Sequence, residues 1–347
     1  MLKVALIGAG KMGISHLSIL GAHPYVEVVG VCDTSKMVMD TFEKYSVFPT
    51  YLDYKTMIEL ARPDAVFVAV PTKYHYDFIK ELLNKNIHVF SEKPFCLTLE
   101  QGKELVELAK SKNVVNQVGY HNKFVATFKE VKRIVKEGYL GDLQHFSGEA
   151  YGPVVVKKKQ TTWRSDPSEG GGCLMDYASH VIDLINDILS PVTASVGSLV
   201  KSVYSNNVDD AVYSLLELDT GLSGVLSVNW SDETYRKMST SITISGSKGK
   251  IISDASELKV FFKDNYFHSG YSKGWNVKYV TDLTEQVDFY LRGEEYSAQV
   301  DYFVKAALGK VPNTINTFES AWLTKNAISI IKKSSKKTTH GKNLIWG

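Results

Sequence analysis

The chain has 347 residues, of which 44% are hydrophobic, with 40 lysines and arginines against 38 aspartates and glutamates. This length exceeds what one hydrophobic core usually organises, so two domains are expected. The formal net charge of +2 gives no electrostatic basis for binding nucleic acid or an anionic membrane.

The cysteines and the N-terminus favour a reducing, cytoplasmic location. Cys32, Cys96 and Cys173 form no Cys-x-x-Cys pair, which argues against a zinc site or a disulfide framework. The chain passes from Met1 directly into an apolar strand, without the charged lead and cleavage site of a secretion signal. No apolar run approaches the roughly 20 residues that a membrane helix needs. We therefore expect a cytoplasmic protein without a metal and without a membrane partner.

Residues 1 to about 120 alternate short β-branched runs with amphipathic helical stretches, which is typical of a parallel sheet wrapped by helices. Strands are predicted over 4–7, 27–31, 65–70, 88–91 and 114–118. Helices are predicted near 11–20, 36–45, 74–85 and 99–111.

After about residue 122 this alternation stops. The sequence predicts a helix over 124–137 and then, as antiparallel strands, 144–151, 212–218, 222–230, 241–244 and 258–262. Residues 265–293 show no clear period, and helices are predicted near 295–308 and 318–332. The fold class is therefore α/β, with an N-terminal Rossmann domain over 1–122 and a second α/β domain over 123–347.

A glycine motif follows the first strand. Gly8-Ala9-Gly10-Lys11-Met12-Gly13 has the spacing in which one glycine makes a tight turn, one lets the backbone approach a pyrophosphate, and one packs the helix on the strand. Asp33 ends the second strand, 20 residues beyond Gly13, where a carboxylate binds the adenosine ribose and repels a 2′-phosphate. NAD is thus favoured over NADP, although Asp33 could instead only cap the following turn, and Lys36 could reach a phosphate.

Two further motifs are candidates for catalysis. Ser91-Glu92-Lys93-Pro94 presents a lysine from the carboxyl edge of the parallel sheet, where open α/β folds bind ligands. In a helix over 173–189, Asp176, His180, Asp183 and Asp187 would share one face opposite an apolar stripe. Periodicity alone favours a solvated helix face, and a metal site is the least favoured interpretation.

Together these motifs resemble the Gfo/Idh/MocA oxidoreductase family. The resemblance spans nearly the whole chain and rests, in this order, on Gly8-x-Gly10-x-x-Gly13, Glu92-Lys93-Pro94, Trp163-Arg164, and Gly170-Gly171-Gly172 followed by Asp176 and His180. It implies that the second domain has a large, mostly antiparallel open sheet, whose open face forms a homodimer or homotetramer contact. It also implies an NAD(P)-dependent dehydrogenase that acts on a CH–OH group.

The resemblance also assigns site residues. The catalytic residues are Lys93, Asp176 and His180. Cofactor contacts are expected from Gly8, Gly10, Lys11, Met12, Gly13, Asp33, Pro71, Thr72, His75, Glu92 and Lys93. Substrate contacts are expected from Tyr120, Asn122, Lys123, Trp163, Arg164, Asp176 and His180. The family often has an arginine after the fifth strand, where this chain has Tyr120-His121-Asn122-Lys123-Phe124.

Hydride departure from a carbinol needs a base for the hydroxyl proton and a cation for the developing oxyanion. We expect His180 as the base, Lys93 as oxyanion partner and proton relay, and Asp176 as substrate anchor; Lys93 is the alternative base. The substrate is a sugar, a cyclitol or a sugar nucleotide, contacted by loops 152–168 and 265–293. A rival hypothesis is a dinucleotide-sensing regulator that keeps the fold without the chemistry.

Overall fold

The structure is a computed structural model that describes residues 1–155, 163–285 and 293–340. It divides into two compact units, Met1–Phe124 with Gln286–Trp322, and Val125–Glu285 with Leu323–Gly347. The sequence predicts a single division at residue 122. In the structure the chain instead returns to the first unit over Gln286–Trp322. Helix α9 (Glu294–Ala307) belongs there because it buries Val300, Phe303 and Val304 in the same core as α1. No local sequence pattern reveals such a return.

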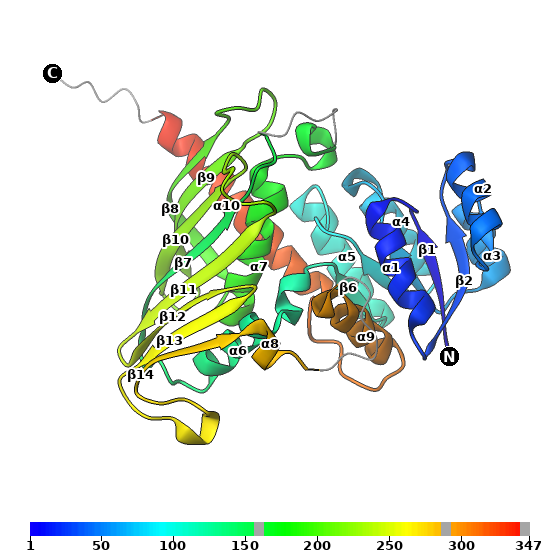
Figure 1. Cartoon of the computed structure of the whole chain (residues 1–347). Helices are drawn as coiled ribbons and strands as arrows, with labels where there is room; N and C mark the ends of the chain where they lie inside the picture. The colour runs from blue at the N-terminus through cyan, green and yellow to red at the C-terminus, as the bar shows by residue number, and fades with distance from the viewer. Residues whose placement is uncertain (156–162, 286–292, 341–347) are drawn as a thin grey trace. The chain divides into compact units, whose positions relative to one another are not determined.

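A six-stranded parallel sheet organises the first unit (Figure 1). Its strands are β1 (Leu2–Ile7), β2 (Val26–Cys32), β3 (Thr50–Tyr51), β4 (Ala65–Val68), β5 (His88–Ser91) and β6 (Asn116–Val118). Its helices are α1 (Lys11–Ala22), α2 (Lys36–Tyr45), α3 (Tyr54–Ala61), α4 (His75–Asn84), α5 (Leu99–Lys112), α9 and the start of α10 (Phe318–His340). The order β3-β2-β1-β4-β5-β6 is that of dinucleotide-binding folds, whose ligands bind beyond the carboxyl ends of the strands.

Strand β1 shows why this sheet is buried on both faces. Val4 and Leu6 lie in one core with α1 and α9, while Ala5 and Ile7 lie in another with α3, α4 and α5. Successive side chains of a strand point to opposite faces. A continuous apolar run is therefore what a strand between two helical layers requires.

The sequence also sets the ends of α5, the helix that follows Glu92-Lys93-Pro94. Thr98 Oγ1 accepts a hydrogen bond from Gln101 N at 3.2 Å, and Gln101 Oε1 accepts one from Thr98 N at 3.3 Å. This capping box satisfies two donors that the first turn would leave unpaired. Asn113 ends the helix in the left-handed region at φ 51°, which asparagine tolerates better than most residues.

An eight-stranded sheet organises the second unit, in the order β14-β13-β12-β11-β7-β10-β9-β8. Its strands are β7 (Leu143–Tyr151), β8 (Val192–Lys201), β9 (Ala211–Leu218), β10 (Ser223–Asn229), β11 (Ser239–Gly246), β12 (Gly249–Asp254), β13 (Glu257–Phe262) and β14 (Gly274–Tyr279). Only β7 and β10 run parallel; the other neighbours are antiparallel. The predicted architecture of a Rossmann sheet followed by a large, mostly antiparallel sheet is confirmed.

Helices cover one face of this second sheet. They are α6 (Ala126–Lys136), α7 (Ser179–Ile188) and the later part of α10, which share one hydrophobic core with the strands. The short helix α8 (Val280–Leu283) follows β14. The opposite face carries no helix among the described residues (Figure 1).

The sequence prediction missed β3, α3, β8, β12, β14 and α8. Residues 265–293 were expected to lack regular structure, but Gly274–Tyr279 forms the edge strand β14. Parts of the two expected substrate loops, residues 156–162 and 286–292, lie outside the described residues. The predicted helix over 173–189 begins instead with a π-helical turn, Leu174–Ala178, and continues as α7.

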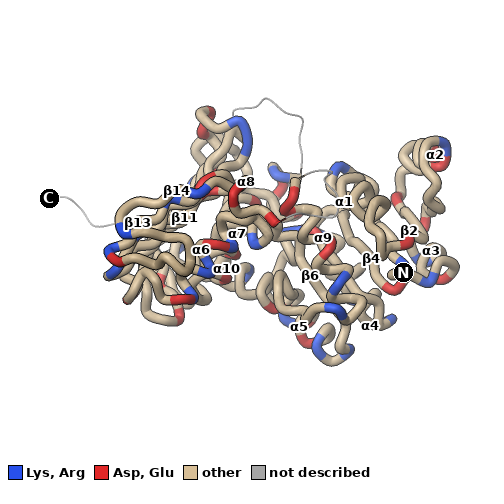
Figure 2. Tube along the Cα trace, turned by 60° about the horizontal axis from the view of Figure 1, so that its bottom comes forward, with Lys and Arg blue, Asp and Glu red and all other residues tan. Residues whose placement is uncertain are grey.

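Basic and acidic residues are interspersed along the trace of both units (Figure 2). In this view, neither sign of charge is confined to one stretch of the trace of either unit. Within the described residues, no helix is both long and apolar enough to cross a membrane.

Candidate active site

The glycine motif forms the turn between β1 and α1, and its three glycines have different surroundings. Gly8 has φ +95°, and a Cβ there would lie 2.5 Å from Ala69 O. A Cβ at Gly13 would lie 1.9 Å from Gly8 O, so this position packs the helix against the turn. A Cβ at Gly10 would meet nothing within 4 Å. The fold itself therefore explains Gly8 and Gly13, whereas Gly10 leaves open space at the start of α1.

Asp33 connects this turn to the end of β2. Its Oδ2 accepts a hydrogen bond from Ala9 N at 2.8 Å, and its Oδ1 accepts one from Ser35 N at 2.9 Å. The turn-capping contact considered from the sequence is thus present. Each carboxylate oxygen can accept more than one hydrogen bond, so these contacts leave acceptor capacity at the edge of the sheet.

The segment after β4 is fixed by a buried histidine. His75 Nε2 lies 2.9 Å from Val70 O, and its Nδ1 lies 2.9 Å from Pro94 O. Burial lowers the pKa of His75, while its contacts with the two carbonyls act in the opposite direction. His75 therefore joins the loop after β4 to the turn that carries Lys93. Thr72 is buried and Pro71 is exposed in this loop.

Glu92 and Lys93 follow β5, the next strand of the sheet. Glu92 Oε1 lies 2.6 Å from His16 Nε2, and Glu92 Oε2 accepts a hydrogen bond from Lys93 N at 3.2 Å. Burial raises the pKa of Glu92, but the hydrogen bond and charge of His16, with the charge of Lys93, outweigh it and hold the pKa below its usual value. The Lys93 side chain is half-buried. These contacts place an ionised carboxylate next to the backbone amide of Lys93.

Of the predicted substrate residues after β6, Asn122 and Lys123 lie in a short 3-10 turn, His121–Phe124, and Tyr120 directly precedes it. Tyr120 packs into the core on the α4 and α5 side of the sheet, and its carbonyl accepts a hydrogen bond from Asn316 Nδ2 at 2.7 Å. Asn122 and Lys123 are buried, while His121 stacks on Tyr296 of α9 at 4.7 Å between ring centroids. All of these residues belong to the first unit.

In the second unit, Asp176 lies on the π-helical turn and His180 on the first turn of α7. Both are buried, with 1% and 3% of their surfaces exposed. Arg164 Nε donates to Asp176 Oδ2 at 2.7 Å, and the Arg164 guanidinium lies 4.7 Å from the Trp163 ring centroid. Two residues of the predicted Trp163-Arg164 and Asp176-His180 motifs are therefore joined by an ion pair. Single π-helical turns occur frequently at functional sites.

The interpretation of this helix face as solvated surface is wrong. Asp183 is as buried as Asp176, because α10 covers this side: Thr324 Oγ1 lies 3.3 Å from Asp183 Oδ1, and Lys325 Nζ lies 3.5 Å from Met175 Sδ. Only Asp187 remains partly exposed, paired with Lys132 at 2.8 Å. Among the described residues, no group of three or more His, Cys, Asp or Glu side chains is placed to hold a metal ion.

The comparisons with known proteins agree with this arrangement. Residues 2–120 match the family described as "Oxidoreductase family, NAD-binding Rossmann fold", and residues 128–252 match the "GFO/IDH/MocA C-terminal domain". The chain belongs to the Gfo/Idh/MocA family.

Some relatives within the Gfo/Idh/MocA family are named as sugar or cyclitol dehydrogenases, and others only as uncharacterized oxidoreductases. The chain is 28% identical over 200 residues to D-glucoside 3-dehydrogenase of Escherichia coli, covering 57% of each protein. It is 25% identical over 270 residues to myo-inositol 2-dehydrogenase of Thermotoga maritima, covering 73% of this chain and 75% of that protein. The chain spans only about half to three fifths of the length of several curated relatives.

A solved structure titled as levoglucosan dehydrogenase in complex with NADH and levoglucosan has the same fold. It superposes with a TM-score of 0.84 at 20% identity and covers 97% of each chain. The family models confirm the family assignment, and this structural match confirms the fold predicted from the sequence.

Sequence reasoning within the Gfo/Idh/MocA frame missed two residues that support the site. His16 lies three residues after Gly13 on the buried side of α1, where a polar residue among Leu17 and Leu20 was a usable signal. Asp209 lies before β9; its carbonyl accepts from Cys173 N at 2.8 Å and its Oδ2 from Leu174 N at 2.6 Å. Gly172 is required beside it, because a Cβ there would lie 2.6 Å from Asp209 Oδ1. Nothing in the local sequence around Asp209 indicated this contact.

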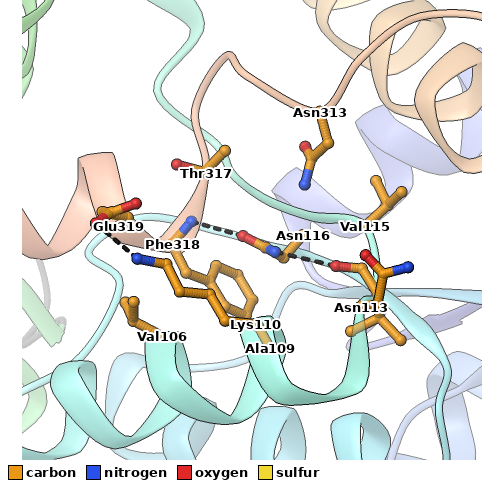
Figure 3. Close-up of a pocket in the computed structure, with 11 residues that line it drawn as sticks. Val106, Ala109, Lys110, Asn113, Val115, Asn116, Asn313, Thr317, Phe318 and Glu319 are labelled. Carbon is orange, nitrogen blue, oxygen red and sulfur yellow. Dashed lines mark hydrogen bonds and ion pairs between the residues drawn. The ribbon is translucent and has the colours of Figure 1, made fainter.

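A pocket of about 350 Å³ lies elsewhere in the first unit (Figure 3). It is lined by the end of α5 and by Asn116 at the start of β6, with an ion pair of 2.8 Å between Lys110 and Glu319 at its rim. Since it sits at the amino end of β6, whereas Gly119 and Tyr120 follow the carboxyl end, this pocket is separate from the candidate site.

Proposed function

We propose that the chain is an NAD-dependent dehydrogenase that transfers a hydride between the nicotinamide cofactor and a secondary alcohol or ketone of a sugar, cyclitol or sugar nucleotide. The names of the relatives D-glucoside 3-dehydrogenase and myo-inositol 2-dehydrogenase support this substrate class. The alternative is a regulator of the same fold that binds the dinucleotide without catalysing a reaction.

One observation carries the catalytic interpretation. Asp176 and His180 are buried at 1% and 3% exposure, and Asp176 is paired with Arg164. Burying ionisable groups costs free energy, so proteins retain them mainly where charge is needed for function or for a specific pairing. A regulator that had lost the chemistry would have no need to keep both groups in this position.

The first unit fits a dinucleotide. The open space at Gly10 allows the backbone at the start of α1 to approach a pyrophosphate, and the amide groups of that helix end favour an anion. We assign cofactor contacts to Gly8, Gly10, Lys11, Met12, Gly13, Asp33, Pro71, Thr72, His75, Glu92 and Lys93. The bound nicotinamide would supply the hydride acceptor during oxidation.

The charges around Asp33 support NAD rather than NADP. The Asp33 carboxylate would repel a 2′-phosphate. Lys36, which was considered as a phosphate ligand, has its ammonium 2.7 Å from Asp40 Oδ1. A 2′-phosphate at this edge would therefore meet a carboxylate and a lysine that is already paired.

The remaining roles concern the reacting carbinol. As the C–H bond gives up its hydride, His180 takes the hydroxyl proton and the Lys93 ammonium donates a hydrogen bond to the developing oxyanion. Asp176, held by Arg164, accepts a hydrogen bond from a neighbouring hydroxyl. Tyr120, Asn122, Lys123 and Trp163 complete the proposed substrate contacts.

The open face of the eight-stranded sheet supports a homo-oligomer. On β9, Tyr213 and Leu215 point to this face, opposite the buried Val212, Ser214 and Leu216. On β14, Trp275, Val277 and Tyr279 are 48–56% exposed and pair with the outward residues of β13. An apolar surface of this kind marks an interaction site, and a second copy of the chain is the proposed occupant.

Two measurements test the proposed function. Tryptophan fluorescence titrations with NADH and NADPH should give tighter binding of NADH. A panel of aldoses, inositols and UDP-sugars, each mixed with NAD, should then give reduced-nicotinamide absorbance at 340 nm for one substrate class. NADH binding without turnover of any compound in the panel would favour the regulator instead.

A further inference from the structure

The buried pair of His16 and Glu92 joins the glycine-motif helix to the turn that carries Lys93. His16 lies on α1 and is 1% exposed, with its ring centroid 5.0 Å from that of Phe90 and 5.6 Å from that of Phe67. An apolar side chain would suit these surroundings. The position holds instead an imidazole whose Nε2 lies 2.6 Å from Glu92 Oε1.

The imidazole is costly at this place, which indicates that it has a task. His16 Nδ1 is buried and has no hydrogen-bond partner among the described residues. A buried polar atom without a partner destabilises the fold whichever tautomer the ring adopts. Because a carboxylate only accepts hydrogen bonds, Nε2 must carry the proton that bonds Glu92. His16 is thus a donor dedicated to one carboxylate.

Glu92 in turn contacts the backbone of Lys93. Its second oxygen, Oε2, accepts the hydrogen bond from Lys93 N at 3.2 Å. Gly119 leaves room for this carboxylate, since a Cβ there would lie 3.1 Å from both of its oxygens. On the other side of Lys93, the Pro94 carbonyl contacts His75 Nδ1 at 2.9 Å. The peptide group before Lys93 is therefore held by the Glu92 side chain, which His16 of α1 holds in turn, and the carbonyl of Pro94 is held by His75 of α4.

We propose that His16 is a positioning residue for Lys93, acting through Glu92, and that it couples the helix of the glycine motif to the catalytic lysine. This inference rests on the proposed function, which makes Lys93 catalytic. Since α1 begins where the pyrophosphate is proposed to bind, displacement of Glu92 should weaken both the placement of Lys93 and the affinity for the dinucleotide.

The variants His16→Phe and His16→Gln separate the hydrogen bond to Glu92 from the packing of the ring. Phenylalanine keeps the aromatic contacts with Phe67 and Phe90 but removes the donor. Glutamine places an amide nitrogen close to where Nε2 stood, so it restores a donor without the imidazole. The double variant His16→Phe/Glu92→Gln removes the buried charge that the single phenylalanine variant leaves uncompensated, so it remains informative if that variant folds poorly.

The chain supplies a matched control in His23. This histidine caps the other end of α1, is also buried, and its Nε2 lies 3.2 Å from Asp301 Oδ1 of α9. His23→Leu removes a buried histidine–carboxylate pair from the same helix and the same unit, but leaves Glu92 and Lys93 untouched. It should lower the melting temperature without changing the Lys93 turn.

The readout is amide hydrogen–deuterium exchange of the peptide covering Val89–Cys96 in the protein without cofactor, together with NADH affinity. We expect His16→Phe and the double variant to speed exchange of this peptide and raise the Kd for NADH, each by about tenfold, the factor that corresponds to about 1.4 kcal/mol. His16→Gln should stay within about threefold of the wild type, and His23→Leu should leave both quantities unchanged.

The proposal is overturned if both variants that lack the donor keep wild-type exchange at this peptide while their melting temperature falls as it does for His23→Leu. His16 would then be a structural residue only. The exchange measurement needs neither cofactor nor substrate. If the protein binds no NADH and oxidises no polyol, the proposed function fails, and the exchange result still decides whether His16 positions the Lys93 turn.

Discussion

Arg164 and Asp176 form an ion pair in the second unit, with Nε 2.7 Å from Oδ2, in which the carboxylate is 1% exposed and the arginine side chain 39% exposed. The pair reaches from the short 3-10 helix Trp163–Ser165 to the π-helical turn. Gly171 makes this approach possible, because a Cβ there would lie 2.4 Å from Arg164 O. The arginine thus neutralises a buried carboxylate while much of its own side chain remains accessible.

Replacing Arg164 should therefore damage the site more than the fold. We expect Arg164→Met to lower kcat/KM at least about tenfold, because Asp176 loses the group that orients it, and to cost about 1–3 kcal/mol of stability, reduced by the exposure of the arginine. Steady-state kinetics and thermal melting measure the two effects. Lys132→Met, which breaks the exposed pair with Asp187, is the control and should leave kcat/KM unchanged. Equal kinetic losses in both variants would contradict the assignment of Asp176.

The two candidate proton-handling residues make separate predictions. Lys93→Met and His180→Gln should each lower kcat by about 10²- to 10⁴-fold, the range that positioned acid–base groups contribute. His180→Gln should keep wild-type NADH affinity, since His180 is proposed to contact substrate only. Near-normal oxidation rates in both variants would show that the assignment of these residues is wrong.

The glycine turn provides a pair of variants with opposite expectations. Gly10→Ala places its methyl group in open space, so the melting temperature should stay within about 2 °C of the wild type. The same methyl group would occupy the proposed path of the pyrophosphate, so the Kd for NADH should rise at least about tenfold. Gly13→Ala should instead destabilise the fold, because its Cβ would collide with Gly8 O. Unchanged NADH affinity in Gly10→Ala would show that the dinucleotide does not bind at this turn.

The first unit was largely predictable because its strands are continuous apolar runs and its glycine motif sits between a strand and a helix. Strand β3 was missed since it has only two residues, Thr50–Tyr51. In β8, small residues such as Ala194, Ser195 and Gly197 weaken the alternation, and two register shifts interrupt it. Its pairing with β9 depends on the tertiary fold more than on local pattern.

The sequence proposes residues for the candidate site but does not show their environment. Motif spacing singled out Lys93, Asp176 and His180, yet periodicity could not show that α10 covers the polar face of α7, since that contact spans more than 140 residues of sequence. Local sequence also could not reveal that Asp209 holds the start of the π-helical turn or that His16 meets Glu92. Each of these contacts depends on a chain segment brought in by the fold.

Asp209 predicts an unusual dependence of stability on pH. Burial raises its pKa, while the hydrogen bond from Leu174 N opposes the shift. A carboxyl group with a higher pKa in the folded than in the unfolded state destabilises the fold as pH rises through that range. Asp209→Asn keeps an oxygen that can accept from Leu174 N, so its melting temperature relative to the wild type should improve from about pH 4 towards pH 7.

Glu130, in the same unit, should show the opposite dependence of stability on pH. Burial raises its pKa, but the hydrogen bonds from Arg133 and Tyr271 outweigh burial, and the pKa is lowered overall. Its stabilisation is present above the unfolded-state pKa and is lost as pH falls through the folded value. Glu130→Gln should therefore be less stable than the wild type at pH 7, with the difference disappearing in acid. Parallel pH profiles for the two variants would contradict the prediction for Asp209.

The open face of the eight-stranded sheet gives the last prediction. Leu215 on β9, next to the edge strand β8, and Val277 on the opposite edge strand β14 are 53% and 48% exposed. If a second copy covers the face, the double variant Leu215→Lys/Val277→Lys buries two charges at the interface and should dissociate the assembly, because an unpaired buried charge costs several kcal/mol. Light scattering coupled to size exclusion should then give the 38.7 kDa mass of a single chain. Val47→Lys, at a 93% exposed position of the first unit, is the control and should leave the assembly intact.

A wild-type protein that already elutes as a monomer at micromolar concentration would refute the proposal that a second copy covers this face. Both lysine side chains point away from the helix-covered core, so the double variant should keep its fold, and loss of assembly would then report the interface alone.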